Sequence, residues 1–255
     1  MHILFTVNSA WNVWNFRMPI INALICDGHD VTVLAPVDDF VSDLESAGCR
    51  FIPQSIDVKG LNPFDGIKWM LKFKKVLLQE RPDIVLSYTI KNNIFGAIAS
   101  KACKIPFIPN VTGLGTAFIS GGLLQKVAEL LYKKAFAFLP CVFFQNIDDL
   151  DLFLERRLVQ AKQAHLLPGS GIDLTKFAPV EYPSELAGVV FLMISRVLSD
   201  KGIFEYVEAA RIVKAKWPHA RFQLLGSIEA TNRSAIDKEI VQSWQEEGII
   251  EYLGK

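Results

Sequence analysis

The sequence has no surplus of charge of either sign. Lys plus Arg number 27 and Asp plus Glu number 27, so the formal net charge is zero over 255 residues. A nucleic-acid binder needs many cations to neutralise phosphates, so this balance argues against nucleic acid as a partner. Together with 51% hydrophobic residues, it also excludes a disordered chain, which combines low hydrophobicity with high net charge.

Cysteine pairs with metal-ligand or redox spacing are missing as well. None of the four cysteines lies in a Cys-x-x-Cys pair, and no His-x-x-x-His lies nearby. Zinc and thioredoxin-like sites are therefore excluded, and we predict buried, reduced thiols and no metal site.

Long apolar runs and targeting signals are also missing. The longest uncharged apolar run, 135–144, contains Pro140 and is far shorter than the roughly 20 residues that span a bilayer. The first residues have no basic region and no small-residue cleavage site, so they predict a strand rather than a signal peptide. We expect a cytoplasmic location without a transmembrane helix.

The sequence instead alternates short apolar runs with longer amphipathic ones. Because the short runs are apolar throughout, they indicate strands buried on both faces of a parallel sheet, and the alternation predicts an α/β fold of β-α-β units. The predicted strands are 2–7, 30–35, 51–53, 83–88, 105–110, 141–145, 188–195, 221–226 and 249–253, and the predicted helices are 16–26, 38–47, 64–80, 92–103, 123–138, 147–158, 202–216 and 234–246.

One segment, 165–182, interrupts this alternation with several Pro and Gly residues. Such a composition is typical of a boundary between domains. We predict a first domain at 1–165, a linker at 166–188 and a second domain at 189–255.

The loop after the first strand, 8–15, contains no glycine. This excludes the G-x-G-x-x-G site for NAD or FAD at this loop. Trp and Asn are present instead, and they suit a sugar because rings stack on CH faces and amides bind hydroxyls. Two interpretations stay open: a sugar site with Asn8, Trp14 and Asn15, or Trp rings that cover a domain interface. Arg17 follows and either approaches an anionic ligand or is a solvated charge.

Two later loops follow strands that end at the same sheet edge. Thr112 and Gly113 begin a Gly-rich loop without the Lys of a Walker A motif, and its N–H groups either cap an anion or form a tight turn. Lys91 and Asn92 follow the preceding strand. A lone Lys is ordinarily solvated, but its place beside the other two loops favours a role in binding.

Arg196 directly follows the strand 188–195, and Lys201 begins the next helix. Two cations beside the N–H groups of a helix N-terminus suit a diphosphate leaving group, whose charge grows as its bond breaks. The alternative is chance, because many such loops hold one Arg and one Lys. Arg196 and Lys201 are the catalytic candidates.

These residues resemble a known family. The segment 191–210 is similar to the donor-domain signature of family-4 glycosyltransferases, and 167–179 is similar to their linker, with Ser170 at the usual Asn position. Segments 15–21, 61–64, 91–96 and 113–115 resemble a bacterial subgroup, of the N-acetylgalactosaminyltransferase type, that extends undecaprenyl-diphosphate-linked sugars.

The resemblance implies a GT-B fold, with two Rossmann-like domains that bind the acceptor and the nucleotide sugar. It implies retention of configuration, no metal or other cofactor, and a donor diphosphate held by Arg196 and Lys201. The substrate-binding candidates are Asn8, Trp14, Asn15, Arg17, Lys91, Asn92, Thr112, Gly113, Gly171 and Gly226.

Two departures from the family stand out. The family often has a Gly-Gly loop where this chain has Trp and Asn. The Glu-x₇-Glu motif of the family would lie beyond Lys255, so we expect an incomplete second domain.

We predict a retaining glycosyltransferase that moves a hexose or N-acetylhexosamine from a UDP-sugar to a polyprenyl-diphosphate-linked saccharide. The alternatives are an inactive fragment that retains only acceptor binding, and a GT-B epimerase that acts on a UDP-sugar.

The helix 64–80 combines lysines with Trp69 and Phe73. One interpretation is a peripheral contact with anionic lipid at the inner face of a bacterial plasma membrane, to which Lys133 and Lys134 would add. The alternative is a solvated helix face whose apolar stripe lies in the core. The lysines are Lys68, Lys72, Lys74 and Lys75.

Overall fold

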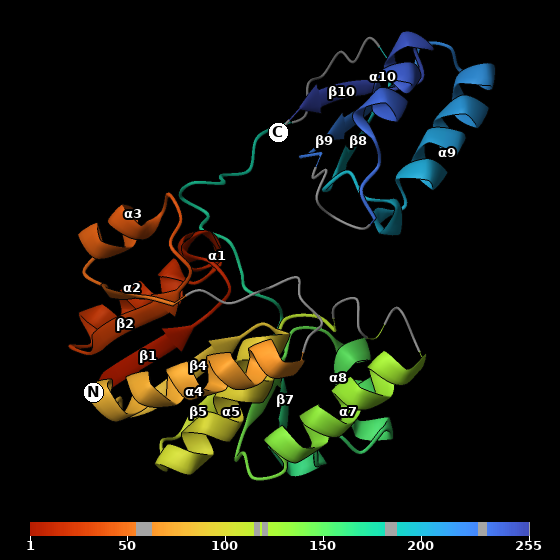
Figure 1. Ribbon diagram of the computed structural model, residues 1–255. Helices are drawn as coiled ribbons and strands as arrows, with labels where there is room; N and C mark the ends of the chain where they lie inside the picture. The colour runs from red at the N-terminus through yellow and green to blue at the C-terminus, as the bar shows by residue number, and fades with distance from the viewer. Residues whose placement is uncertain (55–62, 115–117, 119–121, 182–187, 229–233, 255) are drawn as a thin grey trace. The chain divides into compact units, whose positions relative to one another are not determined.

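A computed structural model of the protein describes residues 1–54, 63–114, 118, 122–181, 188–228 and 234–254 (Figure 1). The chain divides into two compact units, Met1–Ala178 and Pro179–Lys255. Each unit is built on its own parallel sheet, so the predicted α/β fold with two Rossmann-like sheets is confirmed. The finer limits of the linker, 166–188, stay a prediction.

The first unit contains a seven-stranded sheet in the order β3-β2-β1-β4-β5-β6-β7, in which all pairs are parallel. The chain moves outward from β1 to β3 and returns to β4 on the other side of β1. The topological switch point therefore lies between β1 and β4, and open α/β sheets bind ligands there, beyond the carboxyl ends of the strands. The strands are β1 (His2–Thr6), β2 (Asp30–Ala35), β3 (Arg50–Pro53), β4 (Ile84–Tyr88), β5 (Phe107–Val111), β6 (Val142–Phe144) and β7 (Ala164–Leu166).

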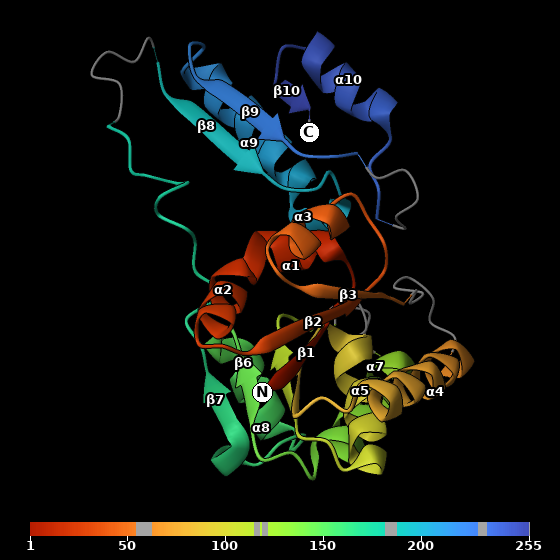
Figure 2. The same ribbon diagram turned by 90° about the vertical axis from the view of Figure 1, so that its left-hand side faces the viewer.

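Helices cover both faces of this sheet (Figures 1 and 2). On one face, Phe5 packs in a core with Val13 of α1 (Ala10–Phe16), Ile21 of α2 (Met18–Cys26) and Leu44 of α3 (Val41–Ser46). On the other, Leu4 and Phe73 belong to a core formed with α4 (Pro63–Glu80), α5 (Ile90–Cys103), α7 (Gly122–Phe136) and α8 (Ile147–Glu155). Each such side chain contributes roughly 1.5–3 kcal/mol on burial, and together they fix the strand ends that form the site.

Two local predictions for the first unit were wrong. The segment 8–15 is not an open loop, because the Ser9 side chain accepts a hydrogen bond from the Asn12 N–H at 3.2 Å and starts α1. Ser is a favoured N-cap residue, and the sequence carried this signal. The predicted helix 16–26 is divided at Arg17, because Pro19 occupies the first turn of a separate helix, α2. Strand β7 was also not predicted; it is short and contains the polar His165.

The second unit has a three-stranded sheet in the order β10-β9-β8, formed by β8 (Val190–Ile194), β9 (Arg221–Leu225) and β10 (Glu251–Gly254). Helices α9 (Ile203–Lys216) and α10 (Lys238–Glu246) contribute Val207 and Trp244 to a core with Phe222. A short 3₁₀ turn, η2 (Ser199–Lys201), precedes α9.

The cysteines differ from the sequence prediction. All four are free, but only Cys49 is buried, while Cys26 at the end of α2 is exposed. Cys26 lies one residue before the turn that ends its helix, where the core does not cover it. Among the described helices, none has the length and apolar composition that crossing a membrane requires.

Candidate functional site

The candidate site of the first unit lies at the carboxyl edge of its sheet. Asn8 follows β1, Thr89 follows β4 and Thr112 follows β5. In a parallel sheet these ends meet at one edge, and β1 and β4 are the neighbours that form the switch point.

Arg17, at the junction of α1 and α2, is held by residues that come from distant parts of this unit. Its Nη1 donates a hydrogen bond to the Ser170 hydroxyl at 2.7 Å. Its guanidinium carbon lies 4.2 Å from the ring centroid of Tyr88, the last residue of β4. Gln145, after β6, donates a second hydrogen bond to Ser170 at 3.0 Å. The chain thus brings together four segments around one cation.

The electrostatics of Arg17 are unusual. The residue is only 4% exposed, so burial lowers the pKa of its guanidinium, although Tyr88 partly opposes this. Among the described residues no carboxylate pairs with it, and its Nε has no hydrogen-bond partner. A buried cation without a carboxylate is costly unless an anion balances it. The burial of Arg17 contradicts the alternative interpretation of a solvated charge, and the predicted anionic ligand stays a prediction.

Buried amides surround the ends of β4 and β5. The Asn92 Nδ2 donates to the Thr89 hydroxyl at 3.3 Å, and the Asn93 Nδ2 donates to the Asn110 carbonyl at 2.9 Å. The side-chain oxygens of both residues, and those of Asn8 and Asn110, have no partner among the described residues. Buried polar atoms are normally satisfied, so four unpartnered amide oxygens around these strand ends are unusual.

Thr89 itself has a strained backbone at the switch point. Its φ of 72° and ψ of 148° fall in a region that β-branched residues rarely occupy. Strain of this kind costs of order 1–3 kcal/mol and is found preferentially at functional sites. Thr89 is the N-cap of α5 and so sets the start of the helix that carries Lys91 and Asn92.

The remaining predicted residues of the first unit are less enclosed. The Trp14 side chain packs against the core, with its ring 5.6 Å from the Lys176 Nζ. Asn15 is exposed and its side chain donates to the Trp11 carbonyl within α1. Thr112, Gly113 and Gly171 are exposed, whereas Lys91 is half-buried. The roles predicted for these residues stay predictions.

The catalytic candidates lie in the second unit. Arg196 follows β8 and Lys201 ends η2, directly before the Gly202 N-cap of α9, and both side chains are exposed. Gly226 follows β9 with φ of 153°, and a Cβ on it would meet the Ser195 carbonyl oxygen at 1.8 Å. Gly226 is thus needed for the close approach of two strand ends, which explains this glycine without a ligand.

Sequence reasoning did not select three of the residues around Arg17, namely Tyr88, Gln145 and Ser170. Tyr88 reads as an ordinary buried strand residue. Ser170 stands in the motif 167–179, but its contact with Arg17 spans 153 positions. Only the strand order brings these residues together. Within the described ranges no group of three His, Cys, Asp or Glu side chains is arranged to hold a metal ion.

Comparison with known proteins gives relatives over the whole chain. Residues 2–146 match the profile of the family described as Glycosyl transferase 4-like. The chain is 32% identical to the N,N'-diacetylbacillosaminyl-diphospho-undecaprenol alpha-1,3-N-acetylgalactosaminyltransferase of Campylobacter jejuni, over 100% of this chain and 69% of that protein. It is 25% identical to the UDP-Gal:alpha-D-GlcNAc-diphosphoundecaprenol alpha-1,3-galactosyltransferase of Escherichia coli, over 77% of this chain and 53% of that protein.

The fold is shared with solved structures. The crystal structure of Anabaena HepE in complex with UDP and glucose aligns with a TM-score of 0.72 and 18% identity, over 100% of this chain and 69% of that one. At this identity the likeness concerns the fold alone, and it confirms the predicted GT-B architecture.

Proposed function

Because this chain belongs to the Glycosyl transferase 4-like family, we propose that it transfers a hexose or N-acetylhexosamine from a UDP-sugar to a polyprenyl-diphosphate-linked saccharide. The observation that carries the proposal is the 32% identity over the entire chain with a transferase whose name specifies a diphospho-undecaprenol acceptor. We further propose that configuration is retained.

In this proposal the first unit binds the acceptor. Arg17 is a buried cation with no described carboxylate partner, and an acceptor diphosphate supplies the missing negative charge. The unpartnered amide oxygens of Asn8 and Asn92 accept hydrogen bonds from sugar hydroxyls. Trp14 is the aromatic ring that the proposal assigns to the apolar CH face of a sugar.

The second unit binds the donor. Arg196 and Lys201 follow β8 and precede α9, where the N-terminal end of a helix adds to the positive potential. Charge accumulates on the UDP oxygens as the bond to the sugar breaks, so two cations there stabilise the transition state more than the ground state. We propose that this cationic pair replaces a metal ion and that no other cofactor is needed.

A lipid-linked acceptor places the reaction at a bilayer. We therefore include in the proposal a peripheral position at the cytoplasmic face of a bacterial plasma membrane.

The test is transfer of labelled sugar by the purified chain. UDP-GalNAc, UDP-GlcNAc, UDP-Gal and UDP-Glc are each supplied with an undecaprenyl-diphosphate-linked monosaccharide, and the lipid product is measured. We expect product with one donor and none without acceptor. Release of a free or epimerised sugar without acceptor would reject transfer in favour of hydrolysis or epimerisation. Acceptor binding without transfer from any donor would reject activity of the 255-residue chain.

A further inference from the structure

Helix α4 carries two apolar stripes instead of one. Trp69, Phe73 and Leu77 are buried in the core of the first unit. The expectation that the aromatic residues Trp69 and Phe73 meet lipid is therefore wrong, because both rings stack inside the core at a centroid distance of 4.9 Å. A second stripe points away from the core and is formed by Ile67, Leu71 and Leu78, of which Leu71 is 59% exposed.

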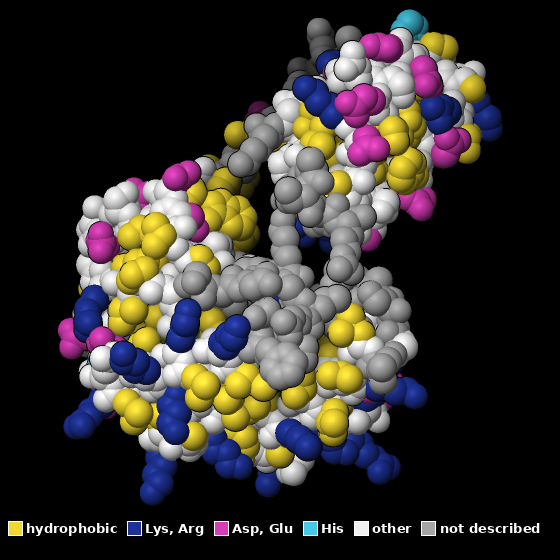
Figure 3. Space-filling view, in the orientation of Figure 1, with side chains coloured by type: hydrophobic (Ala, Val, Ile, Leu, Met, Phe, Trp, Pro, Cys, Tyr) yellow, Lys and Arg dark blue, Asp and Glu magenta, His cyan; other side chains and the backbone are white. Residues whose placement is uncertain are grey.

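This outer stripe is surrounded by cations. Lys74 lies between Leu71 and Leu78 on the same helix face, and Lys68, Lys72 and Lys75 are exposed beside it. Glu80, at the end of α4, is already paired with Arg50, whose Nη2 donates to it at 2.8 Å. Figure 3 shows hydrophobic and basic side chains together on this face of the first unit. An exposed apolar stripe edged by lysines is typical of a helix that lies in the interface of an anionic bilayer.

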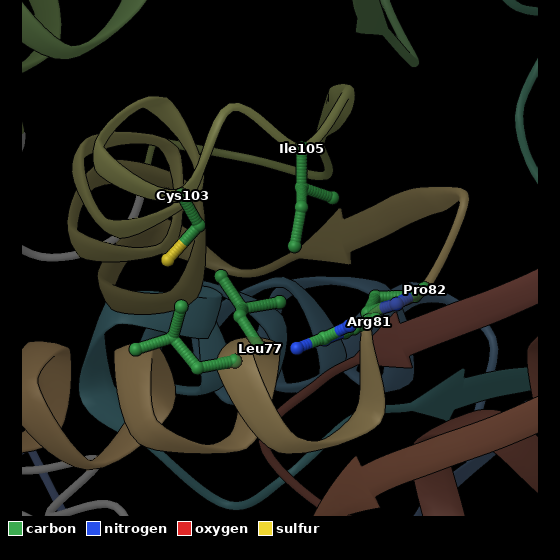
Figure 4. Close-up of a pocket in the computed structure, with 6 residues that line it drawn as sticks. Leu77, Arg81, Pro82, Cys103 and Ile105 are labelled. Atoms are coloured by element: carbon green, nitrogen blue, oxygen red, sulfur yellow. The ribbon is translucent and has the colours of Figure 1, made fainter.

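A groove continues this stripe between α4 and α5. Its volume is about 390 Å³, and apolar side chains line it together with the guanidinium of Arg81 (Figure 4). Leu78 belongs both to the stripe and to the groove, so the two features form one continuous surface. The lining residues are Leu77, Leu78, Arg81, Pro82, Cys103 and Ile105.

Two cations stand at this groove. The Arg81 side chain is exposed and extends along it (Figure 4). Lys74 is exposed one helical turn before Leu78, on the same face of α4, and it is the second cation near the groove. Apolar walls with a guanidinium and an ammonium at the rim match an acyl chain joined to a phosphate.

We propose that the outer stripe of α4 and the groove at its end dock on an anionic phospholipid bilayer, with one acyl chain in the groove and its phosphate at Arg81. This inference rests on the proposed function, because a lipid-linked acceptor lies in a membrane and the protein has to bind there to reach it. Lys126, Lys133 and Lys134 of α7, on the same side of the sheet, add to the attraction.

Vesicle binding tests the docking surface. The full chain is sedimented with vesicles of phosphatidylglycerol or of phosphatidylcholine, and the bound fraction is measured against lipid concentration. We expect binding to the anionic vesicles that weakens with salt. Since one cation near such a surface contributes about 1 kcal/mol, Arg81→Gln should weaken the partition about fivefold, and Leu71→Glu should weaken it at least as much. Ile212→Glu is the matched control, because Ile212 of α9 is also exposed, at 64%.

The groove has an independent readout in its own cysteine. Vesicles should slow alkylation of Cys103 by N-ethylmaleimide, while Cys26, which is exposed at the end of α2, keeps its rate. Equal binding to both vesicle types, or equal losses for Leu71→Glu and Ile212→Glu, would overturn the docking surface. Sedimentation without protection of Cys103 would overturn the groove.

A water-soluble acceptor separates this inference from the proposed function. Leu71→Glu should lose transfer to undecaprenyl-linked acceptor in vesicles and keep transfer to a short-chain analogue in solution. If the unaltered chain transfers to neither acceptor, the proposed function fails, whereas vesicle binding is judged by sedimentation alone.

Discussion

The guanidinium of Arg17 donates a hydrogen bond to the Ser170 hydroxyl, 2.7 Å away and 153 positions later in the chain. This contact ties the junction of α1 and α2 to the segment after β7. The same hydroxyl accepts from Gln145 at 3.0 Å, so one small side chain satisfies two donors. Substitution of Ser170, which accepts from two donors, should therefore affect stability, whereas substitution of Arg17, which lacks a carboxylate partner, should affect transfer.

Arg17→Met should reduce transfer without a comparable loss of stability. Methionine fills a similar volume and removes a buried charge, and replacing buried charges by apolar groups is often neutral or stabilising. We expect the free energy of unfolding to change by less than about 1.5 kcal/mol, while the KM for the acceptor rises. Urea unfolding and steady-state kinetics measure the two effects. A folded Arg17→Met chain with unaltered kinetics would show that Arg17 only fastens the segment after β7.

Ser170→Ala is the companion variant, and it should reduce the free energy of unfolding more than it reduces transfer. It leaves the donors of Arg17 and Gln145 unpaired, and an unsatisfied buried donor costs about 1–3 kcal/mol. Ser170→Thr keeps the hydroxyl and should retain most of the stability.

Lys201→Ala should lower transfer by about 10²-fold or more, since removal of one group that stabilises developing negative charge has this effect. Lys201 is exposed and belongs to a short 3₁₀ turn, so the fold should be unchanged by circular dichroism. Lys216→Ala removes another exposed lysine, at the far end of α9, and should leave transfer unaltered. Equal rates for the two variants would contradict a role of Lys201 at the donor.

Gly226→Ala should destabilise the second unit. The added Cβ would meet the Ser195 carbonyl oxygen at 1.8 Å, and overpacking costs about 1–3 kcal/mol or more. Gly248→Ala is the control, because Gly248 also has a positive φ, of 70°, but has nothing within 4 Å of the added atom. We expect Gly248→Ala to be destabilised only by the strain of the left-handed conformation, which costs roughly 1–2 kcal/mol. Thermal unfolding of the two variants compares the costs, and equal losses would exclude the clash.

The second unit should lose stability in acid through Glu251. Hydrogen bonds from Arg221, and then from Gln223, lower the pKa of this carboxyl from 4.5 to about 2. Because the folded pKa lies below the unfolded value, the contribution is complete above about pH 4.5 and disappears as the pH falls toward 2. Hydrogen exchange of the β9 amides between pH 5 and pH 2.5 should show this loss. Glu251→Gln should flatten the dependence.

The sequence was sufficient for the elements that burial dictates. Mainly apolar runs such as 30–35 and 105–110 predicted strands inside the sheet, and the structure has β2 at Asp30–Ala35 and β5 at Phe107–Val111. The short strand β7, which contains His165, has no such signal, because an edge strand buries little. The helix α1 was missed for another reason: its start depends on one side-chain hydrogen bond from Ser9.

The candidate site was only partly accessible from the sequence. Strand ends predicted Arg17 and Asn92, because loops that follow parallel strands meet at one edge. Tyr88 and Gln145 were missed, since their proximity to Arg17 depends on the order β1-β4-β5-β6-β7 rather than on any local pattern. The burial of Arg17, on which the proposal of an anionic ligand depends, results from the same distant contacts.

Thr89→Gly should stabilise the first unit and impair transfer. Glycine adopts a φ of 72° and ψ of 148° without the clash that a β-branched residue suffers, and relief of such strain returns about 1–3 kcal/mol. The loss of the 3.3 Å hydrogen bond from Asn92 offsets part of this gain. Because Asn92 then loses its fixed position beside the switch point, we expect a higher KM for the acceptor together with a higher melting temperature.

Thermal unfolding and acceptor kinetics on the same preparation measure both, with Thr89→Ser as the control that keeps the hydroxyl. A more stable variant with unaltered acceptor kinetics would mean that the strain at Thr89 serves the packing of α5 and not the site.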